Sequence, residues 1–215
     1  MTASASASAK RSGVIAPYGG TLVDLMVPSA EQPALKASAT KTLECSDRNA
    51  CDVELLVVGG FSPLRGFMHQ EDYDAVVSGH RTSAGHLFGL PIVMDTDRDD
   101  VVVGDKLLLT YKGQELALLE VEDKWEPNKV VEAQGCYGTT SLEHPAVRMI
   151  AMERKCFYLG GTLKGLELPN RVFPCKTPAE VRSALPHGED VVAFQCRNPI
   201  HRAHYELFTR ALHAQ

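Results

Sequence analysis

Short runs of hydrophobic residues, separated by Gly and Pro, follow one another from residue 13 to residue 169. Leu107–Tyr111 and Leu116–Val121 are two of these runs, and only Lys112-Gly113-Gln114 lies between them. Two apolar runs joined by a short polar segment with a glycine are typical of a β-hairpin. We therefore predict a hairpin here and expect the first part of the chain to be mainly β.

Four further elements are predicted in the same stretch. Val101–Val103 and Leu55–Val58 are expected to be short strands, because each apolar run stops at a glycine. Glu71–Ser78 has its apolar residues at helical spacing and is predicted as a helix, and Pro145–Arg154 is expected to be a second helix.

The composition changes near Leu168-Pro169-Asn170, where we place a domain boundary. Thr177 and Glu180 have the spacing of a capping box, and Pro178 suits the first position of a helix. That helix is predicted to stop before Pro186. We thus expect a leader over residues 1–12, one domain over 13–169, and the start of another over 170–215.

The second domain is predicted to be α/β. Val191–Phe194 is an uninterrupted apolar run, which is typical of a strand buried on both faces of a parallel sheet. Asn198 is a favoured N-cap and Pro199 a favoured first residue, so a helix should begin at the carboxyl end of that strand. A helical wheel then predicts a buried stripe made of Ile200, Ala203, Leu207 and Ala211.

Composition and charge exclude several classes of protein. With 44% hydrophobic and 23% charged residues, the 215-residue chain is neither disordered nor low in complexity. The formal net charge of −5 argues against binding nucleic acid through a basic surface, and no apolar run reaches the roughly 18 residues of a membrane span. The six cysteines show no CxxC spacing, so we interpret them as free thiols.

The strongest chemical signal lies between the predicted strand and helix, and its residues are Gln195, Arg197, Asn198, His201 and His204. A helix N-terminus offers free backbone N–H groups and partial positive charge, which suit a phosphate or sulfate oxygen. Arg197 adds a planar cationic fork, and both histidines can project toward the same place. We predict no metal site, because no carboxylate or thiolate supports the two histidines. Two of these residues also have a structural alternative: His204 as a hydrogen-bonded core residue, and Arg197 as the partner of a carboxylate.

The segment Gln195–His204 matches the QxRNPxHxxH motif and so resembles the ATP sulfurylase (sulfate adenylyltransferase) family. Its paired histidines resemble the HxGH signature of the wider nucleotidyltransferase superfamily. Other blocks resemble the PUA-like N-terminal domain of the same family: Pro17–Leu25, Gly59–Met68, Gly138–Thr140 with His144-Pro145, and Tyr158–Gly161. We interpret these blocks as structural, with Phe61, Leu64, Phe67 and Met68 as packing residues; the role of Arg65 stays open.

The resemblance implies a fold and a reaction. The fold would be a mixed one, a mainly β PUA-like domain followed by the truncated start of a Rossmann-like nucleotidyltransferase domain. A sulfate oxygen would attack the α-phosphorus of ATP, supplied with Mg²⁺, and pyrophosphate would leave. Gln195 and Arg197 would hold sulfate, Asn198 would contact the nucleotide phosphates, and His201 and His204 would contact the phosphates as charge develops.

The resemblance also sets expectations beyond the site. It implies a homo-oligomer for the full-length protein. The scattered cysteines indicate a reducing compartment such as the cytoplasm, and the acid-poor, Ser-rich leader leaves a plastid or other organelle as the alternative. Cys196 departs from the motif, where Thr or Leu is usual, and a glycine-rich GRDHAG-like segment is missing. We therefore expect the chain to be a partial sequence, inactive alone and poorly folded after about residue 170. A different nucleotidyltransferase and a non-catalytic PUA-like binding module remain as alternatives.

Overall fold

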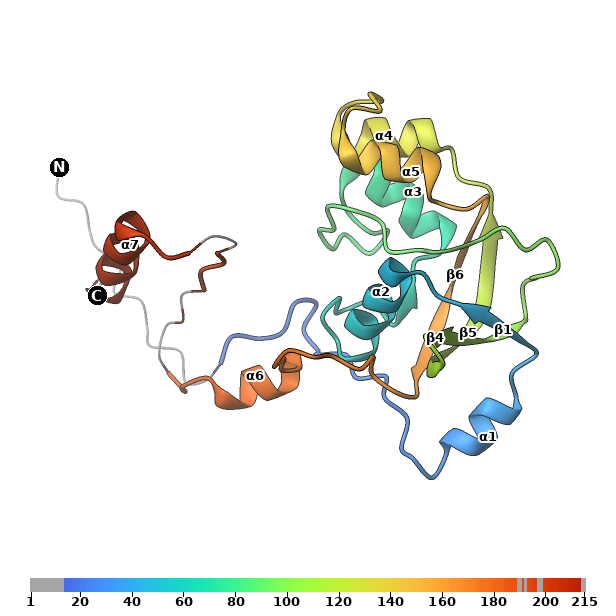
Figure 1. Ribbon diagram of the computed structural model, residues 1–215, viewed down its shortest axis with the longest axis horizontal. Coiled ribbons are helices and arrows are strands. Elements are labelled where there is room, and N and C mark those ends of the chain that lie inside the picture. The colour runs from blue at the N-terminus through green and yellow to red at the C-terminus, as the bar shows by residue number, and fades with distance from the viewer. Residues whose placement is uncertain (1–13, 189–190, 192, 197–198, 214–215) are drawn as a thin grey trace. The chain divides into compact units, whose positions relative to one another are not determined.

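A computed structural model describes residues 14–188, 191, 193–196 and 199–213. These residues divide into two compact units. We call residues 16–180 the N-terminal unit, and the described residues among 1–15 and 181–215 the C-terminal unit. Each unit is described by itself, and Figure 1 shows the elements of both.

The N-terminal unit is a six-stranded sheet with helices around it (Figure 1). Its strands are β1 (Lys41–Glu44), β2 (Gly66–Phe67), β3 (Met94–Thr96), β4 (Lys106–Tyr111), β5 (Gln114–Trp125) and β6 (Phe157–Gly165). Its helices are α1 (Gln32–Ala37), α2 (Asp47–Val57), α3 (Gln70–Gly79), α4 (Lys129–Tyr137) and α5 (Pro145–Met152). The strand order is β1-β4-β5-β6-β2, with β3 also pairing β6, and only the β1–β4 pair is parallel.

The predicted hairpin is confirmed as β4 and β5. Its turn is one residue shorter than expected, because Tyr111 pairs directly with Gln114. Lys112 and Gly113 both have positive φ, 49° and 81°, which is the backbone geometry of a two-residue type I′ turn. Gly113 therefore lies at a turn position that requires a left-handed backbone conformation.

The strand predicted at Leu55–Val58 is wrong, since this run forms the end of α2. The helix begins at Ser46, whose Oγ accepts a hydrogen bond from the backbone N–H of Asn49 at 3.1 Å. Val53, Leu56 and Val57 lie on its buried face, while Leu55 is 40% exposed. Within a run of four adjacent apolar residues the helical spacing cannot be recognised; it can be recognised only over the whole of α2.

The strand predicted at Val101–Val103 is also wrong. Val101 is buried, but the next two valines are more than half exposed. The carboxylate of Asp105 accepts a hydrogen bond from the Val102 N–H at 2.8 Å and another from Lys41. These hydrogen bonds of Asp105 hold residues 102–105 in a turn, so the segment before β4 does not pair as a strand.

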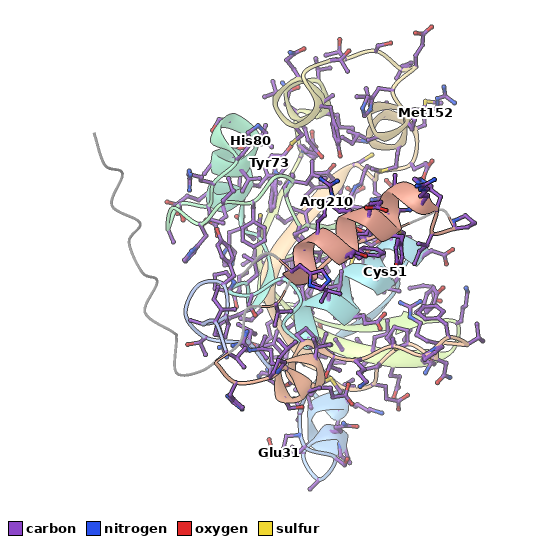
Figure 2. All side chains as sticks on the ribbon, turned by 90° about the vertical axis from the view of Figure 1, so that its left-hand side faces the viewer. Glu31, Cys51, Tyr73, His80, Met152 and Arg210 are labelled. Carbon is purple, nitrogen blue, oxygen red and sulfur yellow. The ribbon has the colours of Figure 1, made fainter. Side chains whose placement is uncertain are left out.

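The two predicted helices of this unit are confirmed as α3 and α5. Helix α3 ends at His80, which takes the left-handed C-cap conformation with φ of 53°. Figure 2 labels His80 and Tyr73 on this helix. Helices α3, α4 and α5 pack together at one end of the sheet (Figure 1).

The core of the unit consists of two apolar clusters. The larger one joins α2 to the sheet, and its fully buried members include Val53, Leu56, Leu107, Leu109 and Leu119. The smaller one joins α3 to β5 and β6 through the rings of Tyr73, Trp125 and Tyr158, whose centroids lie 5.5 to 6.0 Å apart. Aromatic pairs at these distances add directional packing to the burial of apolar area.

The segment before the first strand and the end of the last strand of this unit lie side by side. Met26 and Gly165 form a parallel β-bridge. The Val27 N–H donates to the Gly165 carbonyl at 2.9 Å, and the Gly165 N–H donates to the Leu25 carbonyl at 2.8 Å. Backbone pairing therefore holds the first and last segments of the sheet region side by side.

The predicted capping box is confirmed at the start of α6 (Pro178–Ala184), the helix at which the two units divide. Glu180 accepts from the Thr177 N–H at 2.7 Å, and Thr177 Oγ1 accepts from the Glu180 N–H at 3.3 Å. The helix stops before Pro186, as its sequence predicts.

The other predictions for the C-terminal unit need correction. Its described residues contain no strand: Val191 and Phe194 are 54% and 44% exposed and lie outside regular structure. Helix α7 (Arg202–His213) begins three residues later than predicted, and the stripe expected to be buried is uncovered, with Ile200 65% exposed. A central strand and a helix stripe are buried only against neighbouring strands, and the described part of this unit has none.

Candidate functional site

The segment that carries the chemistry is only partly described. Arg197 and Asn198 lie outside the described residues, so the N-cap predicted at Asn198 and the cationic fork of Arg197 stay predictions. Gln195 is exposed, in irregular structure. His201 is the residue before α7, and His204 lies in its first turn.

The two histidines are brought together. Their rings are stacked, with centroids 3.8 Å apart and planes at 25°. The backbone N–H of His201 donates to Nδ1 of His204 at 3.4 Å. This places the His204 side chain where the Glu or Gln of a capping box lies, satisfying a free N–H at the helix start.

The same hydrogen bond indicates which tautomer the neutral His204 ring adopts. A nitrogen that accepts a hydrogen bond carries no proton, so the neutral His204 ring has its proton on Nε2. His204 can therefore donate from Nε2 to an acceptor at the helix N-terminus. Phosphate and sulfate oxygens are acceptors of this kind.

Phe194 is a residue of this site that the sequence analysis assigned only to the predicted strand. Its ring lies against His204, with centroids 5.4 Å apart, and meets the Phe208 ring edge-on at 5.0 Å. The signal was available, since Phe194 directly precedes Gln195 and Phe208 follows His204 by one helical turn. The His204 imidazole therefore contacts two rings, those of His201 and Phe194, and Phe208 packs against Phe194.

The first turn of α7 contains no acidic residue. A helix of this length has free N–H groups and partial positive charge at its start, and no carboxylate on its own first turn competes for them. Within the described residues no group of three His, Cys, Asp or Glu side chains is placed to hold a metal ion. Cys196 is an exposed free thiol in the same segment.

The block Gly59–Met68 of the N-terminal unit is built as a packing element. Ser62 Oγ donates to the Gly59 carbonyl at 2.7 Å and accepts from the Val23 N–H at 3.0 Å. Phe67 and Met68 are both 2% exposed. These contacts favour the structural interpretation of the block, in which Arg65 has an exposed side chain.

A buried polar cluster in the N-terminal unit is the other place where chemistry could be sought. Glu132, 3% exposed, accepts hydrogen bonds from the hydroxyls of Tyr73 and Tyr158, each at 3.0 Å. Burial raises the pKa of Glu132 above its usual range, and it raises the pKa of both tyrosines as well. These three polar groups bond one another, so the cluster ties α3, α4 and β6 together.

No helix among the described residues has both the length and the apolar character needed to cross a membrane.

Two family models match the chain. The model of the PUA-like domain matches residues 15–168, and the model named ATP-sulfurylase matches residues 174–215. The first match covers the sheet and its helices, and the second covers the segment with the stacked histidines.

Curated relatives match nearly the whole chain. It is 38% identical to a sulfate adenylyltransferase of Phaeosphaeria nodorum over 93% of its length, and 40% identical to one of Chaetomium globosum over 91%. It is 39% identical to a probable bifunctional SAT/APS kinase 2 of Sorangium cellulosum over 93%. The matches cover 36 to 37% of those proteins, so the chain spans little more than a third of their length.

A solved structure has the same fold. The chain superposes on a hexameric APS kinase from Thiobacillus denitrificans with a TM-score of 0.72 and 27% sequence identity. The alignment covers 94% of this chain and 38% of that one.

Proposed function

The chain belongs to the PUA-like domain family, and from this premise we propose that it is the N-terminal portion of an ATP sulfurylase, an enzyme that joins sulfate to ATP. The products would be adenosine 5′-phosphosulfate and pyrophosphate. A sulfate oxygen forms a bond to the α-phosphorus while the bond from that phosphorus to the bridging oxygen of pyrophosphate breaks. No group of the protein is transferred.

Such a reaction depends on placing two anions against each other. Catalysis then comes from orientation and from donors aimed at the developing negative charge. In this proposal Gln195 and Arg197 hold sulfate, and Asn198 contacts the nucleotide phosphates. His201 and His204 donate to phosphate oxygens as the pyrophosphate leaves, and Mg²⁺ arrives with ATP as part of the substrate.

The observation that carries the proposal is the histidine pair at the start of α7. The stacked rings lie 3.8 Å apart, and the hydrogen bond to Nδ1 leaves the Nε2–H of His204 as a donor. A helix N-terminus without acidic residues in its first turn adds further donors for the same anion.

Three further parts of the proposal concern the whole protein. Residues after 169 begin a Rossmann-like nucleotidyltransferase domain. The full-length enzyme is a homo-oligomer, and the hexameric APS kinase from Thiobacillus denitrificans supports this part of the proposal. It works in the cytoplasm or in a plastid or other organelle.

The test uses the longest protein that contains this chain in its source. Sulfate-dependent formation of pyrophosphate from ATP, and ATP formation from adenosine 5′-phosphosulfate and pyrophosphate, are assayed for this protein and for His204→Ala and Arg197→Ala. Each variant should lose about 10²-fold or more in kcat, the cost typical of removing one such donor. His213→Ala, at the exposed end of α7, is the control and should retain activity.

Three results would contradict the proposal or one of its parts. Activity of Arg197→Ala close to that of the unaltered protein would remove its assigned role, and turnover of ATP with another acid but not with sulfate would favour a different nucleotidyltransferase. An intact mass of 23.4 kDa in the source, without activity, would favour a binding module.

A further inference from the structure

An open pocket of about 310 Å³ lies within the N-terminal unit, away from the histidine pair in sequence. It is formed by the segment Pro63–His69, by the start of α3 at Asp72, by the loop from Thr82 to His86, and by Gly161 and Thr162 of β6. Its volume is at the small end of the range for ligand sites. None of the residues assigned to the sulfate chemistry lines this pocket.

Several side chains of the lining have hydrogen-bond donors for which no other described residue supplies an acceptor. The Arg65 guanidinium is exposed and makes no side-chain hydrogen bond or ion pair with another described residue. Thr82 is 6% exposed; its Oγ1 accepts from the His86 N–H at 3.2 Å, and its own proton goes to no described acceptor. The His86 ring contacts Tyr18 edge-on but forms no hydrogen bond within the described residues.

The acidic groups near the pocket, in contrast, already have donors. Asp72 accepts from both the N–H and the hydroxyl of Ser83, at 2.8 and 2.6 Å. Glu122 accepts from Thr162 and, at 2.9 Å, from His69, which also lines the pocket. Arg65, Thr82 and His86 are therefore the lining residues with donors that have no described acceptor, and these donors match a ligand rich in acceptors.

The loop that carries two of these donors is held in place before any ligand arrives. The Thr82 N–H donates to the His86 carbonyl at 2.9 Å, and the Gly85 N–H donates to the Thr82 carbonyl at 2.8 Å. Ser83 is bonded to Asp72 of α3. Preorganised donors of this kind lose little conformational entropy on binding.

The charged and apolar residues of the lining limit the class of ligand that the pocket can bind. Arg65 is the one full positive charge of the lining without a described partner, and Asp72 places a negative charge in the same lining. A dianion would be repelled more strongly than a monoanion by that carboxylate. Pro63 and Leu64 are only partly buried and give the pocket an apolar wall.

We propose that this pocket binds a small monocarboxylate with a compact apolar body, whose carboxylate lies against Arg65 and Thr82 and whose body lies on Pro63 and Leu64. Arginine offers a carboxylate two parallel N–H donors, and the Thr82 hydroxyl supplies a third.

The experiment titrates the isotope-labelled 215-residue chain with benzoate and follows backbone amide shifts at Arg65, Thr82, His86 and Gly161 by NMR. Saturable shifts at these residues are expected, with a dissociation constant of about 1 mM or below. Arg65→Gln should weaken binding about tenfold. Arg48→Gln removes an exposed arginine of α2 and should leave the binding constant unchanged.

Two comparison ligands decide the class. Inorganic phosphate has no apolar body, and phenyl phosphate carries a doubly charged head on the same ring; both should bind more weakly than benzoate. Equal or tighter binding of either overturns the proposal, as does benzoate affinity that is unaffected by Arg65→Gln or an absence of saturable shifts up to about 20 mM. Each of these results is independent of any sulfate activity.

Discussion

The two units differ in where their side chains find partners. In the N-terminal unit even charged groups are enclosed: Arg154 and Asp95, with side chains 9% and 8% exposed, pair at 3.1 Å. In the C-terminal unit, helix α7 has no buried residue, and Leu207 and Leu212 are 48% and 78% exposed; helix α6, where the units divide, has no buried residue either.

This difference separates the residues that stabilise the fold from those that carry the motif. The N-terminal unit gains its stability from apolar clusters around β4, β5 and β6. Helix α7, with 12 residues and an uncovered apolar stripe, has too little packing of its own to be strongly stable. Changes of sequence should therefore have very different consequences in the two units.

The largest effect is expected from Gly161→Ala in β6. Gly161 has φ of 153°, and a Cβ there would overlap the backbone carbonyl of Glu120 on β5. We expect a loss of more than about 4 kcal/mol in the free energy of unfolding, enough to unfold most of the unit. Urea unfolding followed by the fluorescence of Trp125, the single tryptophan, measures it.

Gly79→Ala is the control, because a Cβ at that position of α3 meets no atom within 4 Å. Its effect should be about 1 kcal/mol or less, in the stabilising direction. A Gly161→Ala protein as stable as the control would contradict the packing described for β5 and β6.

The second comparison pairs one leucine from each unit. Leu107 on β4 is fully buried, so Leu107→Ala should cost about 3 kcal/mol in the free energy of unfolding. Leu207 on α7 is 48% exposed, and Leu207→Ala should change it by less than about 0.5 kcal/mol. Similar losses for the two variants would mean that the described exposure of α7 does not hold in solution.

Asp52 on α2 gives a pH-dependent prediction. Burial raises the pKa of Asp52 to about 6, against the opposing effect of Arg154 and Arg48. A raised folded-state pKa means that the folded protein holds the proton more tightly, so this contribution to stability is present below pH about 4 and lost as pH rises through about 6.

Asp52→Asn should therefore be more stable than the unaltered chain above pH 6, by up to about 3 kcal/mol, and nearly equal to it below pH 4. Urea unfolding of both proteins between pH 4 and pH 8 measures the difference between their free energies of unfolding. The other titrating groups are the same in both proteins, so their contributions cancel in this difference. A difference that does not change with pH, or that grows toward acid, would contradict the burial of this carboxyl group.

The smallest effect is expected at the boundary between the units. Thr177→Ala removes one half of the capping box and should cost about 1 kcal/mol in the local stability of α6. Amide hydrogen exchange in the first turn of α6 measures it, with Thr177→Ser as the variant that keeps the cap. Because α6 has no buried residue, the fluorescence transition of Trp125 should not move.

The sequence predicted those elements whose cause lies within a few residues. The β4–β5 hairpin depends on Lys112 and Gly113, and the start of α6 depends on Thr177 and Glu180. The prediction from the sequence was wrong at Leu55–Val58, because an apolar run of four residues does not distinguish a strand from the end of a helix.

The candidate site was predicted in the same uneven way. The motif indicated His201 and His204, but the hydrogen bond to Nδ1 and the place of Phe194 depend on how the segment folds back on α7. The pairing of Arg154 with Asp95, residues 59 positions apart, has no local signal at all. Spatial partners at such separation follow from the topology of the sheet rather than from spacing.

The parallel bridge between Met26 and Gly165 also has a mechanical consequence. If the chain is pulled from its N-terminal side at Met26 and from its C-terminal side at Gly165, the hydrogen bonds of Leu25, Val27 and Gly165 are loaded together, in shear. Bonds loaded in shear must break at the same time, whereas bonds at the open end of a hairpin break one after another. The sheet is therefore protected from tension transmitted along the chain, and motion of the segments on either side can be absorbed without opening its core.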